Sequence, residues 1–395
     1  MASEWKNVRA ADFIDFNPRL SIKKGALATK VAMDKLRPFT KKIPTTELAE
    51  FAGGSKFCNG DTIMARITPC LENGKTAFVD ILADGEVAFG STEFIVMRAR
   101  EGVSDPQFVY YLATSPAFRN VAIKSMVGSS GRQRVQQGVL DELELTVPPL
   151  DEQQKIGAFF ATIDQKIAIN NEINDNLYTQ ARAITNRWIA ENKDDYDLLS
   201  LSEVAAINPD TYSPKEEWEY VNYLDTSSIT DGCIADIQRI IPASEKLPSR
   251  ARRIIAPNDV VFSTVRPNQR HFGIISEPLP NMLASTGFAV IRSENPLVCN
   301  ELIYLCLTEN AFIEKMQQLA EQSTSTFPSI KPSDLGVCEI PCPKDGLSSN
   351  LTETLRAMFA LVAANHRENA SLAELRDSLL PKLMSGEIDV SAIQL

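Results

Sequence analysis

The chain repeats itself at a period close to half its length, and this duplication limits what it can fold into. Ser91-Thr92-Glu93-Phe94 has a counterpart in Ser285-Thr286-Gly287-Phe288, and residues 61–69 have a counterpart in residues 259–267. The matches keep the same order along the chain. Their period is far longer than the 20–50 residues of solenoid repeats, so the pattern predicts two duplicated domains.

Each copy combines short strand-like runs with one helical stretch. In the first copy the expected strands are 62–67, 76–81, 94–98 and 144–147, and the helical stretch is 106–124. In the second copy the expected strands are 259–265, 273–275 and 288–292, and the helical stretch is 300–318. The sequence therefore predicts an α+β fold for each copy.

A different pattern follows each copy, because side chains recur there at alternating steps of four and three. After the first copy they are Ile156, Phe160, Ile163, Ile167, Asn170, Asn174, Leu177, Ala181, Ile184 and Trp188. After the second copy they are Leu355, Phe359, Val362, His366, Asn369, Ala373, Leu380 and Leu383. These steps are typical of a coiled-coil seam, and polar residues within a seam fix its register. We expect the two helices to pair antiparallel; two amphipathic helices on separate domains are the alternative.

These patterns divide the chain into four parts. We expect a first domain at 1–149, a first helix at 150–193, a second domain at 194–345, and a second helix with the C-terminal tail at 346–395. The predicted fold class is α+β, with two similar domains separated by two long antiparallel coiled-coil helices. The duplication predicts a pseudo-twofold relation between the halves.

The formal net charge of −11 argues against nucleic-acid binding unless the basic residues are clustered. One cluster contains Arg19, Lys23, Lys24, Lys30, Lys35, Arg37, Lys41 and Lys42. Another contains Arg250, Arg252, Arg253, Arg266 and Arg270. Basic loops on an acidic protein can still bind phosphates, because salt screens each charge beyond about 10 Å. Solvated loop surfaces without a ligand are the alternative.

The composition of the chain indicates its cellular compartment and whether it needs a cofactor. No apolar run approaches the roughly 18 residues that span a membrane, and the N-terminus lacks signal-peptide features, so we expect a cytoplasmic protein. The seven cysteines form no Cys-x-x-Cys pair and are expected to be reduced thiols. Cys338 and Cys342 are the one pair of cysteines whose spacing could form a metal site. We nevertheless expect neither a metal nor a cofactor.

Motifs that would carry catalysis are incomplete. His271 and His366 are the two histidines, and neither lies in a triad-like pattern. Gly74-Lys75-Thr76 lacks the first glycine of a phosphate-binding P-loop. Asn17-Pro18 and Asn208-Pro209 lack the aromatic residue and cofactor loop of amino-methyltransferases and are predicted to be turns. The sequence therefore favours a binding protein over an enzyme.

Three stretches of the chain resemble type I restriction-modification specificity subunits. They are residues 148–156 with the helix that follows, residues 375–388, and residues 60–75. The resemblance implies that each domain reads one half of a split double-stranded DNA target. It also implies helices that act as a spacer and dock two modification (methyltransferase) subunits, with restriction (nuclease/translocase) subunits completing the complex. The second helix departs from the family, because Leu351-Thr352-Glu353 replaces the usual Pro-Leu-x-Glu-Gln start.

Side-chain chemistry indicates the candidate DNA-contacting residues. Arg and Gln suit bidentate contacts to base edges, and Ser and Thr suit phosphates. In the first domain they are Lys23, Lys24, Arg66, Lys75, Ser129, Ser130, Arg132, Gln133 and Arg134. In the second domain they are Arg250, Arg252, Arg253, Arg266, Asn268, Gln269, Arg270, Ser323 and Thr324. Ordinary exposed loop residues are the alternative for each.

Three other functions remain open from the sequence. The chain could be the specificity subunit of a methyltransferase without a restriction partner. It could be an enzyme whose active site is shared between the two domains, or a coiled-coil scaffold that does not bind DNA. The first differs from our main hypothesis in its neighbouring genes, the second in turnover by the purified chain, and the third in the absence of a gel shift.

Overall fold

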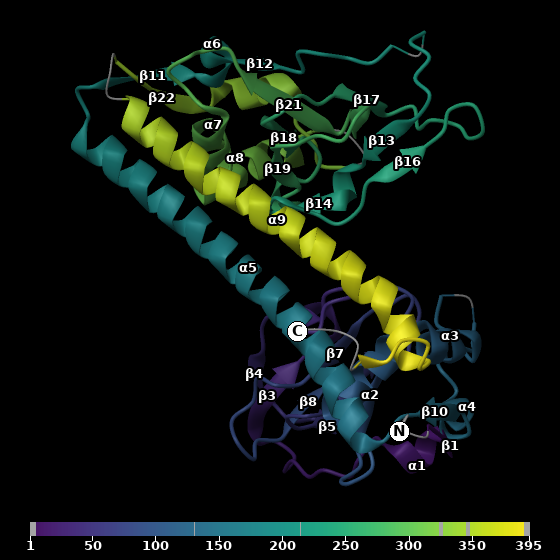
Figure 1. Ribbon diagram of the computed structural model, residues 1–395. Helices are drawn as coiled ribbons and strands as arrows, with labels where there is room; N and C mark the ends of the chain where they lie inside the picture. Colours follow the sequence, from purple (N-terminus) through teal and green to yellow (C-terminus); the bar gives the residue numbers. More distant parts are fainter. Residues whose placement is uncertain (1–4, 130, 214, 324–326, 345–347, 391–395) are drawn as a thin grey trace. The chain divides into compact units, whose positions relative to one another are not determined.

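A computed structural model describes residues 5–129, 131–213, 215–323, 327–344 and 348–390 (Figure 1). The chain divides into two compact units. The first unit comprises Met1–Ile169 and Glu368–Leu395, and the second comprises Asn170–Arg367. Each unit contains one copy of the duplicated domain and parts of the long helices α5 (Leu150–Glu191) and α9 (Ser348–Met384).

The first unit is built from ten short strands and four short helices within its described residues. The strands are β1 (Lys6–Arg9), β2 (Ile14–Phe16), β3 (Leu27–Val31), β4 (Glu47–Glu50), β5 (Ser55–Phe57), β6 (Thr62–Ala65), β7 (Thr76–Phe78), β8 (Ala88–Gly90), β9 (Phe94–Ala99) and β10 (Glu144–Val147). The helices are α1 (Ala10–Phe13), α2 (Pro106–Thr114), α3 (Pro116–Lys124) and α4 (Gln137–Asp141), with a 3-10 turn η1 (Met33–Lys35).

The second unit follows the same order with a few additions. Its strands are β11 (Tyr196–Ser200), β12 (Ala205–Ile207), β13 (Val221–Leu224), β14 (Ile229–Thr230), β15 (Cys233–Ile234), β16 (Gln238–Ile240), β17 (Ala251–Ile254), β18 (Asp259–Ser263), β19 (Phe272–Ile275), β20 (Met282–Ser285), β21 (Phe288–Ser293) and β22 (Glu339–Pro343). Its helices are α6 (Leu201–Val204), α7 (Asn300–Leu307) and α8 (Asn310–Glu321), with 3-10 turns η2 (Thr226–Ser228), η3 (Pro267–Gln269) and η4 (Pro332–Val337).

The sheets of the two units share one topology. In the first unit one sheet has the order β2-β9-β6-β7, and the other has the order β4-β3-β8-β5 with β3 and β8 parallel. In the second unit the corresponding orders are β12-β21-β18-β19 and β16-β13-β20-β17, with β13 and β20 parallel. The predicted duplication and the α+β fold class are therefore confirmed.

In both copies an asparagine side chain makes the same hydrogen bond to a strand of these sheets. Asn17 and Asn208 each have a positive φ, 52° and 57°, which asparagine tolerates better than most residues. Their side-chain oxygens accept hydrogen bonds from the N–H groups of Val96 and Val290, each at 3.0 Å. The two Asn-Pro motifs are thus turns, as predicted.

A buried carboxylate pairs with an arginine at the same place in each copy. Asp61 accepts a hydrogen bond from Arg98 Nε at 2.7 Å, and Asp259 accepts one from Arg292 Nε at 2.8 Å. Both aspartates are fully buried, so each arginine compensates a charge that would otherwise be costly to remove from water. These pairs belong to the shared framework of the fold.

The prediction of a single helical stretch in each copy is wrong, because each stretch is divided into two helices. In the first copy Ser115 is extended, with φ −64° and ψ 149°, and α3 begins at Pro116. Proline lacks an N–H group and disfavours a helical conformation in the residue before it. In the second copy the extended residue is Glu309, and α8 begins at Asn310.

Within each unit the segments of α5 and α9 run antiparallel. In the first unit Asp164 pairs with Arg376 at 2.7 Å, and two residues later Lys166 pairs with Glu368 at 3.2 Å. Ile163, with Ile167 packed against it, shares an apolar cluster with residues of α9. The predicted antiparallel pairing is confirmed in this unit.

The second unit shows the same antiparallel arrangement with a polar seam. Asn365 Nδ2 donates a hydrogen bond to Asn174 Oδ1 at 2.7 Å, and the rings of Tyr178 and Phe359 lie 5.4 Å apart. The seam prediction fails near the end of α5, where Ile184 is 38% exposed and Thr185 is buried. A straight helix repeats every 3.6 residues, so a strict 3.5-residue pattern drifts away from the buried face.

Candidate nucleic-acid interface

In the first unit the loop before α4 lies against the end of β6. The N–H of Val135 donates to the carbonyl of Arg66 at 2.9 Å, and Arg134 forms an antiparallel bridge with Ile67. Gln133 exchanges two hydrogen bonds with Thr68, each at 3.0 Å. These backbone contacts bring three of the predicted residues, Arg66, Gln133 and Arg134, to one edge of the domain.

Arg134 is held at this edge by Glu93, which follows the Ser-Thr motif. Its Nε lies 3.0 and 2.9 Å from the two carboxylate oxygens, and its Nη2 lies 2.7 Å from Oε1. The hydrogen bond from Arg134 lowers the pKa of the Glu93 carboxyl, because it stabilises the charged form. The side chain of Arg134 remains 46% exposed.

Arg66 is more enclosed than Arg134. Its Nη2 donates to the carbonyl of Val135 at 3.3 Å, and its buried Nε has no hydrogen-bond partner within the described residues. An orphaned buried guanidinium N–H costs free energy. Arg66 also lowers the pKa of Glu93 by its positive charge.

The other candidates of the first domain differ in how available they are. Ser129 and Arg132 are exposed in the loop, and Lys23 and Lys24 are exposed beside the turn before β3. Lys75 is half-buried and its Nζ donates to the carbonyl of Met33 at 3.0 Å, so its charge is already engaged. Ser130 lies outside the described residues.

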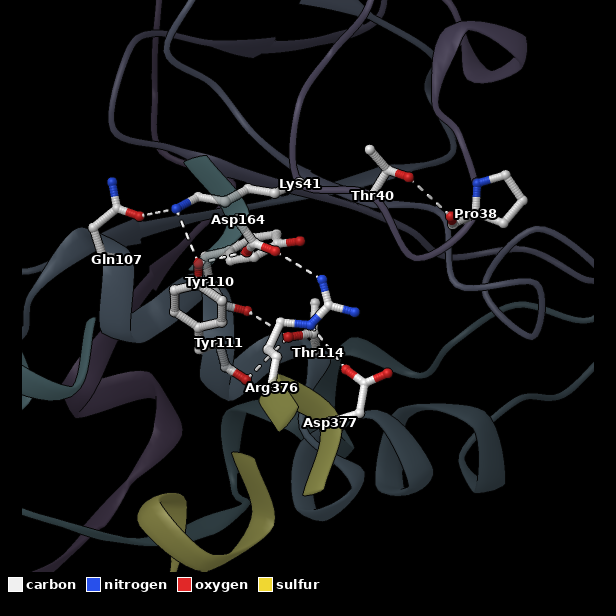
Figure 2. Close-up of polar contacts among 10 residues, drawn as sticks. All are labelled: Pro38, Thr40, Lys41, Gln107, Tyr110, Tyr111, Thr114, Asp164, Arg376 and Asp377. Atoms are coloured by element: carbon white, nitrogen blue, oxygen red, sulfur yellow. Dashed lines mark hydrogen bonds and ion pairs between the residues drawn. The ribbon is translucent and has the colours of Figure 1, made fainter. Parts of the chain in front are cut away.

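Lys41, from the first basic cluster, is partly buried and joins a polar chain within the first unit (Figure 2). Its Nζ donates to Tyr111 Oη at 3.2 Å, and Tyr111 Oη donates to Asp164 Oδ2 at 2.6 Å. Arg376 Nη1 completes the chain at 2.7 Å from Asp164 Oδ1. Burial lowers the pKa of Lys41 and raises that of Tyr111. Lys41 is thus engaged within the first unit and is not a free loop charge.

The second unit forms the same edge with different side chains. The N–H of Ile330 donates to the carbonyl of Thr264 at 2.9 Å, and Ser329 forms an antiparallel bridge with Val265. Thr264, Ser329 and Gly287 occupy the positions of Arg66, Arg134 and Glu93. Thr264 is buried and donates to the carbonyl of Gly287 at 2.9 Å. The arginine cluster of the first edge is therefore absent from the described part of the second.

The cations of the second edge lie instead on the turn η3. Arg266 and Arg270 flank this turn, and both are left-handed, with φ 47° and 59°. The guanidinium of Arg266 lies 5.1 Å from the ring centre of Phe327. Arg270 Nε pairs with Asp231 at 2.6 Å. Asn268 and Gln269 are exposed at the tip of the turn, Ser323 is half-buried, and Thr324 lies outside the described residues.

The remaining second-domain candidates lie on or beside β17. Arg250 has an exposed side chain, and its carbonyl accepts a hydrogen bond from Thr286 N–H at 2.8 Å, which places it next to the motif that contains Gly287. Arg252 Nε donates to the carbonyl of Ser249 at 3.1 Å. Arg253 is half-buried, its Nε has no partner within the described residues, and burial lowers its pKa.

Two residues of interest were missed at the level of sequence. Glu93 is acidic and was not considered for DNA binding, although its replacement by glycine in the second copy was visible in the duplicated motif. Arg239 lies with its guanidinium 4.2 Å from the ring centre of Tyr220, and no sequence pattern pairs these two residues. The contacts of these two residues with Arg134 and Tyr220 are revealed only by the fold.

Neither a metal site nor a membrane span is found in the part of the chain that the structure describes. No group of three or more His, Cys, Asp and Glu side chains there is arranged to hold a metal ion. Cys338 and Cys342 are buried free thiols. None of the described helices has both the length and the apolar composition needed to cross a membrane.

Comparison with known proteins first defines a class. Residues 2–179 match the family model of the type I restriction modification DNA specificity domain. The match covers the first domain and much of α5. The first copy is thus a DNA specificity domain, and the second copy shares its topology.

Relatives that match most of the chain then define the family. The type I restriction enzyme HindI specificity subunit of Haemophilus influenzae is 24% identical, over 83% of this chain and 86% of that protein. The type I restriction enzyme MjaVIII specificity subunit of Methanocaldococcus jannaschii is 21% identical, over 98% of this chain and 93% of that protein. The type I restriction-modification system S subunit from M. genitalium has a similar fold. Its crystal structure gives a TM-score of 0.52 at 15% identity, over 97% of this chain and 96% of that one. Over most of its length the chain is therefore similar to type I restriction-modification specificity subunits.

Proposed function

We propose that this chain selects the DNA target of a type I restriction-modification complex, with each domain reading one half of a bipartite, gapped sequence. The observation that carries the proposal is the pair of equivalent edges with different side chains. Arg66 and Arg134 stand on the first edge where Thr264 and Ser329 stand on the second. Two readers with one framework and different contact residues suit a target whose two halves differ in sequence.

The local charges fit contact with the DNA backbone despite the acidic composition. Exposed cations such as Lys23, Lys24 and Arg132 would neutralise phosphates and release counterions. Arg134, Arg266 and the exposed amides Asn268 and Gln269 would then contact base edges in a groove. Backbone contacts would position each domain, and the base contacts would carry the specificity.

We further propose that the helices set the gap and dock two modification subunits, with restriction subunits completing the nuclease. A helix rises 1.5 Å per residue, so α5 with its 42 residues would be about 60 Å long if straight. That length exceeds the roughly 34–36 Å of one DNA turn that separates successive half-sites in many two-part targets. DNA methylation and cleavage would be supplied by the partner subunits, with this chain contributing specificity.

The domain bounds follow as part of the proposal. We assign residues 1–149 to the first target-recognition domain and 194–345 to the second, with 150–193 and 346–395 as the helical spacer regions. Exchanging residues 1–149 for the equivalent domain of a relative should change one half of the target and leave the other half intact.

The test is to express the chain with modification subunits and map methylated adenines across a host genome. A single gapped motif is the expected result, and the exchange of residues 1–149 should alter only one of its halves. Methylation without a gapped motif, or a simultaneous change of both halves, would contradict the proposal. A gene for a restriction subunit beside this one would distinguish a restriction system from a stand-alone methyltransferase.

A further inference from the structure

The equivalent edges of the two domains differ in their charged side chains and also in one ion pair. In the first unit Glu93 and Arg134 form a side-on pair with three close nitrogen-to-oxygen approaches. The second unit has Gly287 and Ser329 at these positions, so both partners are missing together. The first copy thus has both partners and the second has neither.

The framework ion pairs behave in the opposite way. Asp61 with Arg98 and Asp259 with Arg292 are present in both copies, and their carboxylates are fully buried. A pair that the fold itself requires is therefore found twice. Because the Glu93–Arg134 pair occurs in one copy only, the shared fold does not require it.

The atoms used by Glu93 leave one edge of the guanidinium available. The carboxylate takes Nε and one N–H of Nη2, which lie on the same side of the planar group. Nη1 has no acceptor within the described residues, and Nη2 keeps a second N–H. Nη1 and Nη2 together present two parallel donors, the pattern that matches O6 and N7 of guanine in the major groove.

The surroundings of the pair favour a fixed orientation over a mobile one. Arg134 lies between two antiparallel bridges, to Ile67 and to Val127, so its backbone is held from both sides. Glu93 is only 24% exposed, and its carbonyl accepts the N–H of Arg66 at 2.9 Å. A guanidinium held in this way loses less conformational entropy on binding than a free side chain would.

We propose that Arg134 reads one guanine in the half-target of the first domain and that Glu93 is the positioning residue that aims it. This inference rests on the proposed function and names the base chemistry at one position. The second domain lacks the pair, so it reads its half-target through other groups. Arg266 and Arg270 on the turn η3 are the cations available there.

The experiment uses the full chain assembled with modification subunits and a set of DNA duplexes. Each base pair of the first half-target is replaced in turn, and affinity is measured by competition. The wild-type protein should discriminate against replacement of one G·C pair by roughly tenfold to a hundredfold. Arg134→Ala should abolish that discrimination at this position and at no other.

Variants of Arg134 and Glu93 distinguish the orientation of the guanidinium from its positive charge. Arg134→Lys keeps the charge but cannot present two parallel donors, so it should lose most of the discrimination. Glu93→Gln keeps the shape but weakens the hold on Arg134, so it should reduce discrimination several-fold at the same G·C pair. Asp12→Asn is the matched control, because Asp12 also pairs side-on with an exposed arginine, Arg9. It should leave all positions unchanged.

The outcomes distinguish this inference from the proposed function. Full discrimination by Glu93→Gln would overturn the role of Glu93, and full discrimination by Arg134→Ala, or a first half-target without a G·C pair, would overturn the role of Arg134. In each case the gapped motif itself would survive. Loss of thermal stability without a position-specific change would mean that the pair is structural. Absence of any gapped motif from the wild-type complex would overturn the proposed function and this inference together.

Discussion

The helix α2 of the first domain contacts the long helices through a charged network, whereas its counterpart α7 in the second domain contacts them through aromatic rings. In the first unit Tyr111 donates to Asp164, which also pairs with Arg376. In the second unit Leu305 takes the place of Tyr111. The ring of its neighbour Tyr304 instead lies 5.6 Å from Phe359.

The second unit adds a single arginine at the end of α7. Arg182, on α5, donates to the carbonyls of Leu305 and Thr308 at 3.1 and 3.2 Å. It also pairs with Glu309 at 3.1 Å. A cation is favourable at this position because the last carbonyls of a helix carry partial negative charge. The two units therefore use charge at different points of the same contact.

The comparison shows which parts of a duplicated fold are free to diverge. Asp61–Arg98 and Asp259–Arg292 are retained in both copies, because an unpaired buried aspartate would be strongly destabilising. The contact with the helices needs only complementary surfaces. Ion pairs with satisfied hydrogen bonds and packed aromatic rings both meet that need.

The largest expected effect comes from removing the apolar seam of the first unit. Changing Ile163 and Ile167 together to Asp would place two unpaired carboxylates in this seam, where Ile163 is buried and Ile167 is partly buried. The cost should be several kcal/mol, a large share of a typical free energy of unfolding. Hydrogen exchange should increase in α2 and α3 and remain slow in α7 and α8. Ile169→Asp is the control, because Ile169 is 43% exposed. Equal loss of protection in both units would show that their stabilities are not separable.

The second prediction breaks the charged network. Arg376→Met leaves Asp164 without its ionic partner, and we expect the first unit to lose about 3 kcal/mol, since one member of a buried pair remains uncompensated. Adding Asp164→Asn should recover part of this loss, because it removes the unpaired charge. Denaturant unfolding of both single variants and the double variant measures the coupling. Strictly additive losses would argue that the network contributes nothing as a pair.

The third prediction addresses the arginine of the second unit. Arg182→Met removes hydrogen bonds to the last turn of α7 and should cost about 1–2 kcal/mol, less than the loss expected in the first unit because Arg182 is partly exposed. Arg182→Lys keeps a cation near these carbonyls and should lose less. Hydrogen exchange in α7 checks both variants. A larger loss for lysine than for methionine would contradict the role assigned to its charge.

The smallest effect is a pH dependence confined to the second unit, which contains both histidines, His271 and His366. Burial lowers the pKa of His366, and its Nε2 has no partner within the described residues. The unfolded chain therefore binds a proton at a higher pH than the folded chain does. Stability should fall as the pH drops through about 6.5 toward the lower folded pKa, by about 1.4 kcal/mol for each unit of pKa difference.

A variant of His366 tests whether this histidine causes the pH dependence. His366→Gln should flatten the dependence of the unfolding midpoint between about pH 8 and pH 5.5. Protection in α2 and α3 should stay constant over the same range. An equal pH response in the first unit would remove His366 as its source.

Much of the fold could be predicted from local pattern. The steps of four and three predicted α5 and α9, and the repeated motifs predicted two domains of one topology. Failures occurred where packing overrides periodicity. Thr185 replaces Ile184 on the buried face of α5, and Ser115 divides a stretch that was predicted to be one helix.

The candidate site was less predictable than the fold. Exposed arginines such as Arg132 and Arg134 could be selected by residue type, but Lys41, from the first basic cluster, is partly buried and donates to Tyr111. Residue type does not indicate burial, because a lysine can be enclosed when aromatic rings and acceptors surround it. Glu93 was missed because it lies 41 positions before Arg134, and only strand pairing brings the two together.

The sequence by itself determined the duplication, the α+β composition, the two long helices and the family resemblance. These features rest on periodicity and on short motifs, which are local properties of the chain. The tertiary structure alone decided which charges are exposed and which carboxylate meets which arginine. Such pairings depend on sheet register and on helix rotation, and both are set by the burial of many residues distant in sequence.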